Sequence, residues 1–419
     1  MTTASATDAG AEAARTVTPL HKAMTSRGKA MLGGAVVVAA AGIALRYPEL
    51  VGLGAAGVTA VAAALGLVAR PPRVRVERQV SPDRVSRGTR IAAKLLVASG
   101  QRRAVPAMAA RDLAGGVPVP CQVARLRPGG SRPVETRLPT GRRGIVRSGP
   151  LSFDHRDAFG LAHRVITIGP VSDLYVRPRP VELPAVAASL ARSLDGPDSD
   201  TTMDGTLSFN SLREYVPGDE LRRVHWRASA HAGKLVVKQY IDTAHAAMAV
   251  VLDEQVADPA QDTAEAFEAA VDCAASLAAV AAAHGQPLRL LNAAGESLLP
   301  VTARRGGATV DDVLDALTPV ALIVVPATMA APDPLPGALR RLAGSGRGSL
   351  AAVITTRSTG RLSDSLRLLA EGYARVIAVQ VTTDPAAAVG ATRTGRVVRA
   401  TVRQPEDLPH ALIQARAAA

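Results

Sequence analysis

Three patterns of hydrophobic and polar residues follow one another along the 419-residue chain. Two long uncharged stretches, 30–45 and 50–69, come first. Short alternating runs separated by Gly, Pro and Asp fill residues 71–180, and from 181 onward apolar runs alternate with amphipathic helical segments. This succession predicts a helical hairpin, an all-β segment and an α/β domain.

The two uncharged stretches predict a transmembrane helical hairpin over residues 30–69. The second stretch has 20 residues, enough to cross about 30 Å of hydrocarbon, and the first has 16 and reaches that length with its flanks. A cleaved signal peptide is one alternative, but no polar, cleavable region follows the first stretch. A pair of Ala-rich helices buried in a soluble domain is the other, although a 20-residue window without a charge is rare there.

Charge is unevenly distributed along the chain, whose net charge is +13. Residues 70–180 carry 22 Lys and Arg against 7 Asp and Glu, a net +15. Basic residues also flank the hairpin: Lys22, Arg27 and Lys29 before it, and Arg70, Arg73, Arg75 and Arg78 after it. The positive-inside rule therefore predicts a multi-pass membrane protein whose soluble domains are cytoplasmic, and we expect the membrane to be the inner (cell) membrane. Residues 1–29 are expected to form a flexible cytoplasmic tail.

The basic segment has two interpretations. It can face anionic lipid of the inner leaflet, where each nearby cation contributes about 1 kcal/mol, or it can be a solvated face. It lacks the interleaved aromatic residues or the recognition helix typical of nucleic-acid binding, so we expect no nucleic-acid partner.

The alternating runs of residues 70–180 predict a β-sandwich of immunoglobulin-like type. Residues 181–419 predict a mostly parallel sheet with helices on both faces. The expected strands are 247–252, 287–291, 321–325, 350–354 and 374–381. The expected helices are 262–284, 310–317, 336–343, 362–371 and 406–418.

The stretch 213–240 is the densest local signal. Pro217-Gly218 indicates a turn, and Asp219 is placed to cap a helix that runs through Ala230. Leu221, Val224 and Ala228 have the spacing of one buried helical face. Gly233 then predicts a helix stop, and the β-branched and aromatic residues 235–240 predict a strand.

The same stretch resembles the signature of the bacterial "domain of unknown function 58" family. The matching residues are Arg213, Tyr215, Pro217, Gly218, Asp219, Arg222, Trp226, Ala228, Gly233, Leu235 and Lys238. The resemblance implies two N-terminal membrane helices, a β-rich segment with an Asp-Pro-Phe-Gly-Leu element, and a von Willebrand factor A-like α/β domain of Rossmann type. In this chain Ala158 takes the proline position of that element, which makes a rigid turn there less certain.

The von Willebrand factor A-like fold implies a metal site where its first strand ends. The pattern of such a site is Asp-x-Ser-x-Ser, because Mg²⁺ prefers several oxygen ligands. In this chain the sequence is Asp253-Glu-Gln-Val-Ala257, so Gln255 and Ala257 replace both serines. Thr355 and Thr356 offer hydroxyls nearby. We expect a degenerate site in which Asp253 caps a strand end or a helix start, with no bound metal and no other cofactor.

No sequence motif for catalysis is present. The chain has no P-loop, no Gly-x-Ser-x-Gly and no Rossmann glycine pattern, and His225 and His231 lie on different helical faces. Cys121 and Cys273 lack metal-ligand spacing and indicate small buried thiols in a reduced compartment. The alternative is a hydrolase or phosphate-handling enzyme centred on Arg213, Asp219, His225 and Lys234, although no nucleophile is identified.

The favoured interpretation is a non-enzymatic adaptor. The family resemblance implies association with a MoxR-type AAA+ ATPase and with a membrane-bound transglutaminase-like protein. Two of the five lysines, Lys234 and Lys238, lie in the signature, where compact ammonium groups suit a partner's carboxylates or a phosphate. We expect the signature residues to bind the partner, with both lysines accessible and Trp226 packed against the domain.

Overall fold

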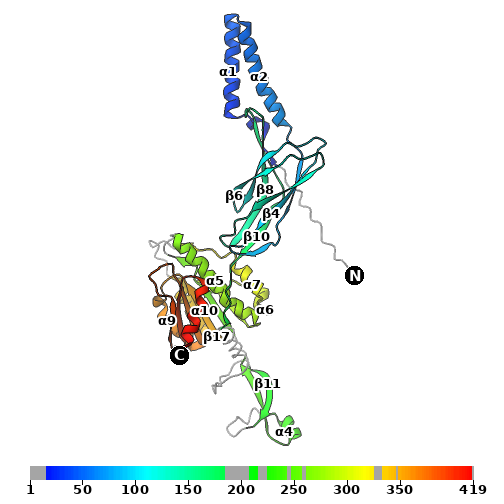
Figure 1. Cartoon of the computed structure of the whole chain (residues 1–419). Helices are drawn as coiled ribbons and strands as arrows, with labels where there is room; N and C mark the ends of the chain where they lie inside the picture. Colours follow the sequence, from blue (N-terminus) through cyan, green and yellow to red (C-terminus); the bar gives the residue numbers. More distant parts are fainter. Residues whose placement is uncertain are drawn as a thin grey trace. The chain divides into compact units, whose positions relative to one another are not determined.

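A computed structural model describes residues 16–184, 207–215, 224–242, 247–256, 261–324, 333–345 and 348–417. The chain divides into two compact units, Met1–Val176 and Arg177–Ala419 (Figure 1). The first unit contains the uncharged helices and a β domain, and the second contains the α/β domain and the signature.

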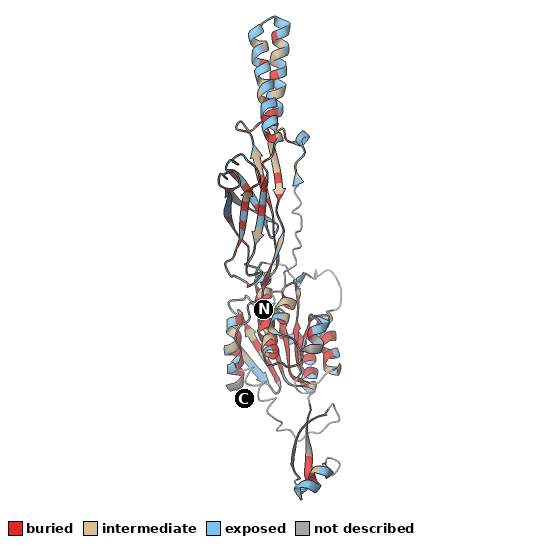
Figure 2. Cartoon of the chain, turned by 90° about the vertical axis from the view of Figure 1, so that its right-hand side faces the viewer, coloured by how far each residue is buried: buried red, intermediate tan, exposed pale blue. Residues whose placement is uncertain are grey.

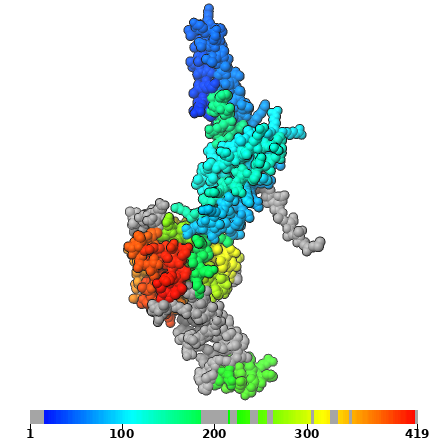
Figure 3. Space-filling model, viewed as in Figure 1, coloured from blue at the N-terminus to red at the C-terminus, as the bar shows by residue number. Residues whose placement is uncertain are grey.

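The uncharged stretches form helices α1 (Ser26–Leu45) and α2 (Pro48–Ala69), which lie side by side (Figures 1 and 3). A left-handed residue, Arg46 at φ 59°, turns the chain between them, and Pro48 begins α2 where its missing N–H costs nothing. A Cβ at Gly54 would stand 2.6 Å from the Ala35 carbonyl oxygen, so glycine lets the two helices approach closely. Both helices are long and apolar enough to span a membrane, as the sequence predicts.

The β domain consists of two sheets that share a core. One has the order β2 (Val74–Gln79), β4 (Ala92–Ser99), β7 (Ser131–Arg137). The other has the order β1 (Thr16–Val17), β9 (His163–Ile168), β8 (Gly144–Arg156), β10 (Ser172–Arg177), β3 (Arg84–Ser86), with β5 (Met108–Ala114) beside β8 and β6 (Val117–Val123) beside β5. Leu95 and Val97 of the first sheet pack with Phe153 and Ile166 of the second. The predicted all-β character is confirmed.

One of the arginines that follow the hairpin is internal to this domain. Arg78 on β2 donates to Asp112 Oδ2 at 2.9 Å and to Ser148 Oγ at 2.5 Å, and the Arg78 and Asp112 side chains are fully buried. It therefore joins the two sheets and, contrary to the expectation from the sequence, is not available as a cation beside the hairpin.

Part of the expected flexible tail has regular structure. β1 pairs antiparallel with β9 through Thr16–Thr167 and Val17–Ile166, a 3₁₀ turn covers Leu20–Lys22, and α1 already begins at Ser26. Pairing with β9 satisfies the backbone hydrogen-bonding groups of β1. Local sequence patterns do not predict it, because β9 lies about 150 residues further along the chain. The remainder of the tail, residues 1–15, lies outside the described residues.

The α/β domain is built on a sheet of order β15 (Leu288–Leu291), β13 (Met248–Leu252), β17 (Gly348–Thr355), β18 (Tyr373–Val381), β20 (Val397–Val402), β19 (Gly390–Thr394). These strands are parallel except β19, which is antiparallel to β20. The strands are buried along much of their length (Figure 2). This confirms the predicted mostly parallel sheet.

Helices cover both faces of this sheet because successive side chains of each strand point to opposite sides. On one face Val250 and Leu252 pack with α5 (Gln261–Ala283), α6 (Val301–Gly306), α7 (Val310–Leu317) and α10 (Leu408–Ala417). On the other face Ala249 and Val251 pack with α8 (Pro334–Ser345) and α9 (Ser363–Gly372). α5 is also long and apolar enough to cross a membrane, but it lies within this core.

The expected strand at 321–325 differs from the structure. β16 (Ile323–Val324) pairs with β14 (Gln255–Val256) in a separate pair and is not part of the main sheet. The β19–β20 hairpin and α6 were not predicted from the sequence, because their short polar segments lack a clear hydrophobic period.

Candidate functional site

The signature forms a small module of two strands and a short helix. β11 (Leu207–Glu214) pairs antiparallel with β12 (Val236–Asp242), and α4 (Trp226–Ala232) lies between them in sequence. Ser229 ties the helix to β12, since its hydroxyl accepts from the Val236 N–H at 2.8 Å. The Tyr215 N–H donates to the Leu235 carbonyl at 2.9 Å and extends the pairing.

The helix begins later than the sequence predicts. His225 is its N-cap, with Nδ1 accepting from the Ala228 N–H at 3.1 Å, whereas the sequence predicts Asp219, which lies outside the described residues. Val224 forms a β-bridge with Val237, and the His225 N–H donates to the Val236 carbonyl at 2.8 Å. These strand-like bonds replace helix at Val224, and the expected helical face through Val224 and Ala228 does not form. Gly233 ends the helix at φ 65°, as predicted.

Trp226 is not packed against the domain. It is 66% exposed, and the prediction that its ring is buried is wrong. Most of α4 is exposed as well, since the short helix buries only Ser229 and half-buries Ala228. Leu235 is 40% exposed beyond the stop, which leaves two large apolar side chains of one small module facing solvent.

Lys234 is accessible, as expected, but it is not without a partner. Its Nζ lies 2.9 Å from Glu214 Oε2, and both side chains are more than half exposed. Such a pair contributes little stability because water screens it. In β11 and β12 Arg213 stands opposite Val237 and Lys238 opposite Leu212 in the backbone register. Pro217, Gly218, Asp219, Arg222 and Leu221 lie outside the described residues.

A second candidate site lies at the carboxyl end of β13. The neighbours of β13 are β15 on one side and β17 on the other, and at such a switch point loops diverge and leave a crevice where α/β sheets bind ligands. Asp253 follows β13 and is fully buried. Its Oδ2 accepts from Thr355 Oγ1 at 2.7 Å, which confirms that Thr355 stands beside it.

The sequence did not predict the most important neighbour of Asp253, which is Arg357. Arg357 donates through Nε to Asp253 Oδ2 at 2.7 Å and through Nη1 to Asp333 Oδ2 at 2.8 Å. Partial burial works against its charge, but the hydrogen bonds to Asp333 and Asp253 outweigh this and raise the pKa of Arg357. A cation at Asp253 would have to displace a guanidinium already held by two carboxylates.

Glu254 adds a second buried carboxyl at this edge. Burial raises its pKa, although the Ala293 N–H donates to Oε2 at 2.9 Å and works in the opposite direction. Among the described residues, no group of three or more His, Cys, Asp or Glu is arranged to hold a metal ion. The residues of this edge therefore do not fit the metal site that the fold resemblance implies.

Neither cysteine has the environment of a reactive thiol. Cys273 is fully buried on α5, and burial raises its pKa strongly. The pKa of Cys121 is also raised, mainly by burial and to a smaller extent by the negative charge of Asp112. Both thiols are therefore poor nucleophiles at neutral pH.

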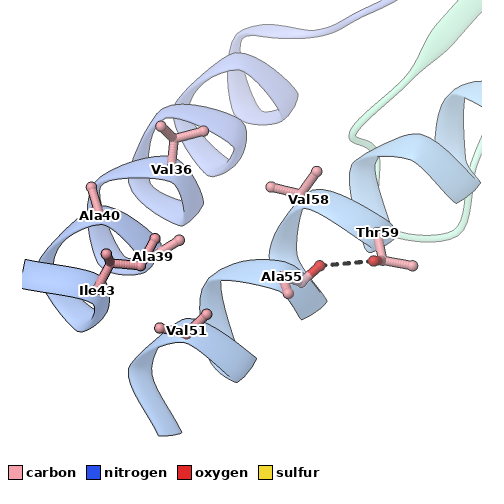
Figure 4. Close-up of a pocket in the computed structure, with 8 residues that line it drawn as sticks. All are labelled: Val36, Ala39, Ala40, Ile43, Val51, Ala55, Val58 and Thr59. Carbon is pink, nitrogen blue, oxygen red and sulfur yellow. Dashed lines mark hydrogen bonds between the residues drawn. The ribbon is translucent and has the colours of Figure 1, made fainter. Parts of the chain in front are cut away.

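An apolar groove runs between α1 and α2 (Figure 4). Its lining is Val36, Ala39, Ala40, Ile43, Val51, Ala55, Val58 and Thr59. The one hydroxyl among them, on Thr59, donates to the Ala55 carbonyl at 2.8 Å. This groove offers no free polar group and suits hydrocarbon rather than a polar ligand.

Comparison with known proteins gives a family for part of the chain. Residues 211–398 match the family model described as "Protein of unknown function DUF58". This match includes the whole signature, residues 213–240, and the sheet from β13 to the start of β20, and it supports the resemblance that the signature carries. No curated protein matches the chain.

Two solved structures with a weak likeness to this chain illustrate the comparison. The CARDB domain of the PF1109 protein from Pyrococcus furiosus is 17% identical, with 25% of this chain and 88% of that chain covered and a TM-score of 0.20. The sporulation control protein Spo0M from Bacillus subtilis is 9% identical, with 30% and 56% covered and a TM-score of 0.18. At TM-scores this low, neither likeness bears on the fold or the function.

Proposed function

We propose that this protein is a non-enzymatic adaptor or assembly factor that α1 and α2 anchor in the inner membrane. In this proposal the protein is multi-pass, and its immunoglobulin-like β domain and von Willebrand factor A-like α/β domain are cytoplasmic. The signature module binds a MoxR-type AAA+ ATPase, and a transglutaminase-like membrane protein and anionic inner-leaflet lipid are further partners.

The observation that carries the proposal is the exposed ring of Trp226. A tryptophan exposed by 66% on an ordered helix leaves a large apolar surface in water, and Trp is the residue type most enriched at the centres of protein interfaces. Leu235, Lys234 and Arg227 are exposed in the same module and supply apolar and cationic contacts around it. This combination is that of a binding surface.

The chemistry of the module also favours binding over catalysis. His225 uses Nδ1 to cap α4, and Lys234 is paired with Glu214, so each group already has a structural or ionic partner. The Ser229 hydroxyl is buried and bonded to the backbone of Val236, which makes it a poor nucleophile. At the sheet edge, Arg357 similarly engages Asp253.

The test is a pull-down between the full-length protein in detergent and the purified MoxR-type ATPase of the same organism. Trp226→Ala should weaken binding by about 30-fold or more, since a central aromatic anchor contributes about 2 kcal/mol or more. Ile413→Ala is the matched control, because Ile413 is 50% exposed on α10, far from the signature in sequence. Undiminished binding by Trp226→Ala would remove the module from the interface, and no binding by the wild type would remove the ATPase as partner.

A further inference from the structure

The turn between β8 and β9 exposes its aromatic side chain. Phe159 is 77% exposed, more than any other large apolar side chain among the described residues, including those on the outer faces of α1 and α2. An exposed phenylalanine forgoes about 2 kcal/mol of burial. The adaptor function proposed above gives this residue no role.

The turn holds Phe159 in place. Asp157 is buried, and its carboxylate accepts from the Phe159 N–H at 2.8 Å and from the Ala162 N–H at 2.6 Å. The Gly160 N–H donates to the Asp157 carbonyl at 3.2 Å, and Gly160 has φ 69°, a conformation that favours glycine. These bonds close the turn although Ala158 replaces the proline of the family element, so the exposed ring projects from an ordered support.

This turn is bonded to the base of the hairpin. Thr25, the N-cap of α1, donates through Oγ1 to the Gly160 carbonyl at 2.8 Å, and its N–H donates to the Leu161 carbonyl at 3.0 Å. Gly28, in the first turn of α1, leaves no room for a Cβ beside the Leu161 carbonyl. In Figure 3 the green atoms of this segment lie directly below the blue helices.

The second helix meets the same turn. Leu161 and Ala162 share a buried apolar cluster with Val61, Ala64 and Val68 of α2. A side chain holds the end of α2 as well, since the Arg164 guanidinium on β9 donates through Nη1 to the Ala69 carbonyl at 3.2 Å. The turn is therefore fixed to both helices where the chain enters and leaves the hairpin.

The sequence sets the level of this turn relative to a membrane. The uncharged stretch of α1 begins at Ala30, five residues after Thr25, which is about 7 Å along a helix. Each headgroup layer of a bilayer is about 5–8 Å thick. Exposed cations surround this level, namely Arg27 and Lys29 on α1, Arg70 after α2, and Arg156 before the turn.

We propose that the Phe159 turn is a third membrane contact, which inserts its aromatic ring at the headgroup level of the bilayer that α1 and α2 span. This inference rests on the proposed membrane anchor and adds to it. Aromatic rings concentrate at this level because they combine an apolar body with the polarity of the interface, and the nearby cations suit anionic headgroups. The contact fixes the orientation of the β domain at the membrane surface.

Tryptophan fluorescence in lipid vesicles tests the proposal. The full-length protein carries one tryptophan, so Trp226→Phe gives a silent background into which Phe159→Trp is introduced. The protein is reconstituted into phosphatidylcholine and phosphatidylglycerol vesicles whose acyl chains are brominated close to the headgroup. We expect the Phe159→Trp variant in vesicles to emit at a shorter wavelength than the same variant unfolded in detergent-free solution. We also expect its emission to be weaker in brominated vesicles than in unbrominated ones.

Two matched variants separate the possible failures. Val37→Trp is on an exposed position of α1, about 10 Å beyond the start of the uncharged stretch, so it is measured in vesicles brominated near the middle of the acyl chains. It should be quenched there if the helices span the bilayer. Val171→Trp should stay unquenched, because Val171 is 49% exposed and follows β9, whose last residue is about 17 Å along the strand from His163 at the hairpin base.

The outcomes are distinct. Quenching of Phe159→Trp and Val37→Trp, without quenching of Val171→Trp, supports the contact. If Phe159→Trp behaves like Val171→Trp while Val37→Trp is quenched, the contact is wrong and the anchor stands. If Val37→Trp is not quenched either, the anchor is wrong and the contact falls with it. Urea unfolding of each variant verifies that the exposed substitutions leave the fold intact.

Discussion

Asp253 at the end of β13 and Trp226 at the start of α4 differ in their exposure to solvent. Asp253 at the sheet edge is fully buried, and Thr355 and Arg357 bond its carboxylate. Trp226 in the signature is 66% exposed and leaves most of its ring in solvent. The polar groups of the sheet edge bond to one another, whereas the signature leaves a large apolar side chain in solvent. In the proposed function the first region therefore contributes stability and the second contributes partner binding.

The largest expected effect is at the sheet edge. Asp253→Ala removes the carboxylate that accepts from Arg357 and Thr355 and should lower the free energy of unfolding by about 3 kcal/mol. This loss of unfolding free energy is at the lower end of the range for a broken buried ion pair, because the Arg357 side chain is 32% exposed and water can solvate its charge. Urea unfolding of the full-length protein measures it.

Asp333→Ala is the matched control for this prediction. Asp333 bonds the same guanidinium, but its side chain is 39% exposed, so its loss should cost about 1 kcal/mol or less. Equal losses of stability for the two variants would show that the burial of Asp253 does not strengthen its bonds to Arg357 and Thr355. The comparison between a sheet edge that stabilises the fold and a signature that does not would then be wrong for the sheet edge.

The alternation of strands and helices in the α/β domain was predictable because its signals are local. α7 forms at the predicted 310–317, and α5, β15 and β18 start or end within one residue of the predicted bounds. Each combines a strong hydrophobic period with a clear break at its ends. The Gly233 stop and the β12 strand were predicted for the same reason.

Arg357 was not predictable in the same way. It stands 104 residues from Asp253 along the chain, and only the parallel pairing of β13 with β17 brings the two together. The helix start at Trp226 likewise depends on the bridge between Val224 and Val237, a tertiary pairing that overrides the local helical period. The sequence did contain one usable signal. Arg357 lies two residues after the end of β17, and Asp253 follows the neighbouring strand β13, so the two are natural partners for an ion pair.

A smaller effect is expected from Glu254, the other carboxyl at the sheet edge. Burial raises its pKa above the usual 4.5, so the folded state favours the protonated form. Its contribution to stability is therefore complete below pH 4.5 and is lost as the pH rises through the raised value. Glu254→Gln cannot ionise and should be more stable than the wild type at neutral pH, by less than about 1 kcal/mol because the Ala293 N–H already offsets part of the burial cost.

Urea unfolding of Glu254→Gln and the wild type at several pH values tests this sign. The stability difference should be near zero in acid and should grow toward neutral pH. A difference that stays constant with pH would mean that Glu254 does not titrate differently in the folded state, and a destabilised variant at neutral pH would reverse the expected sign. Either result would weaken the picture of a sheet edge whose polar groups serve the fold.

The smallest expected effect on folding is at Trp226, which has the largest expected effect on binding. Trp226→Ala should change the free energy of unfolding by no more than about 0.5 kcal/mol, because an exposed ring makes few contacts to lose. Val237→Ala in the same module is the matched comparison, since Val237 is 3% exposed and its truncation should cost about 2 kcal/mol. Urea unfolding, together with amide hydrogen exchange along β12, measures global and local stability of both variants. If Trp226→Ala opens β12 as much as Val237→Ala does, the ring is part of the module's own packing, and the exposed surface that supports partner binding does not exist.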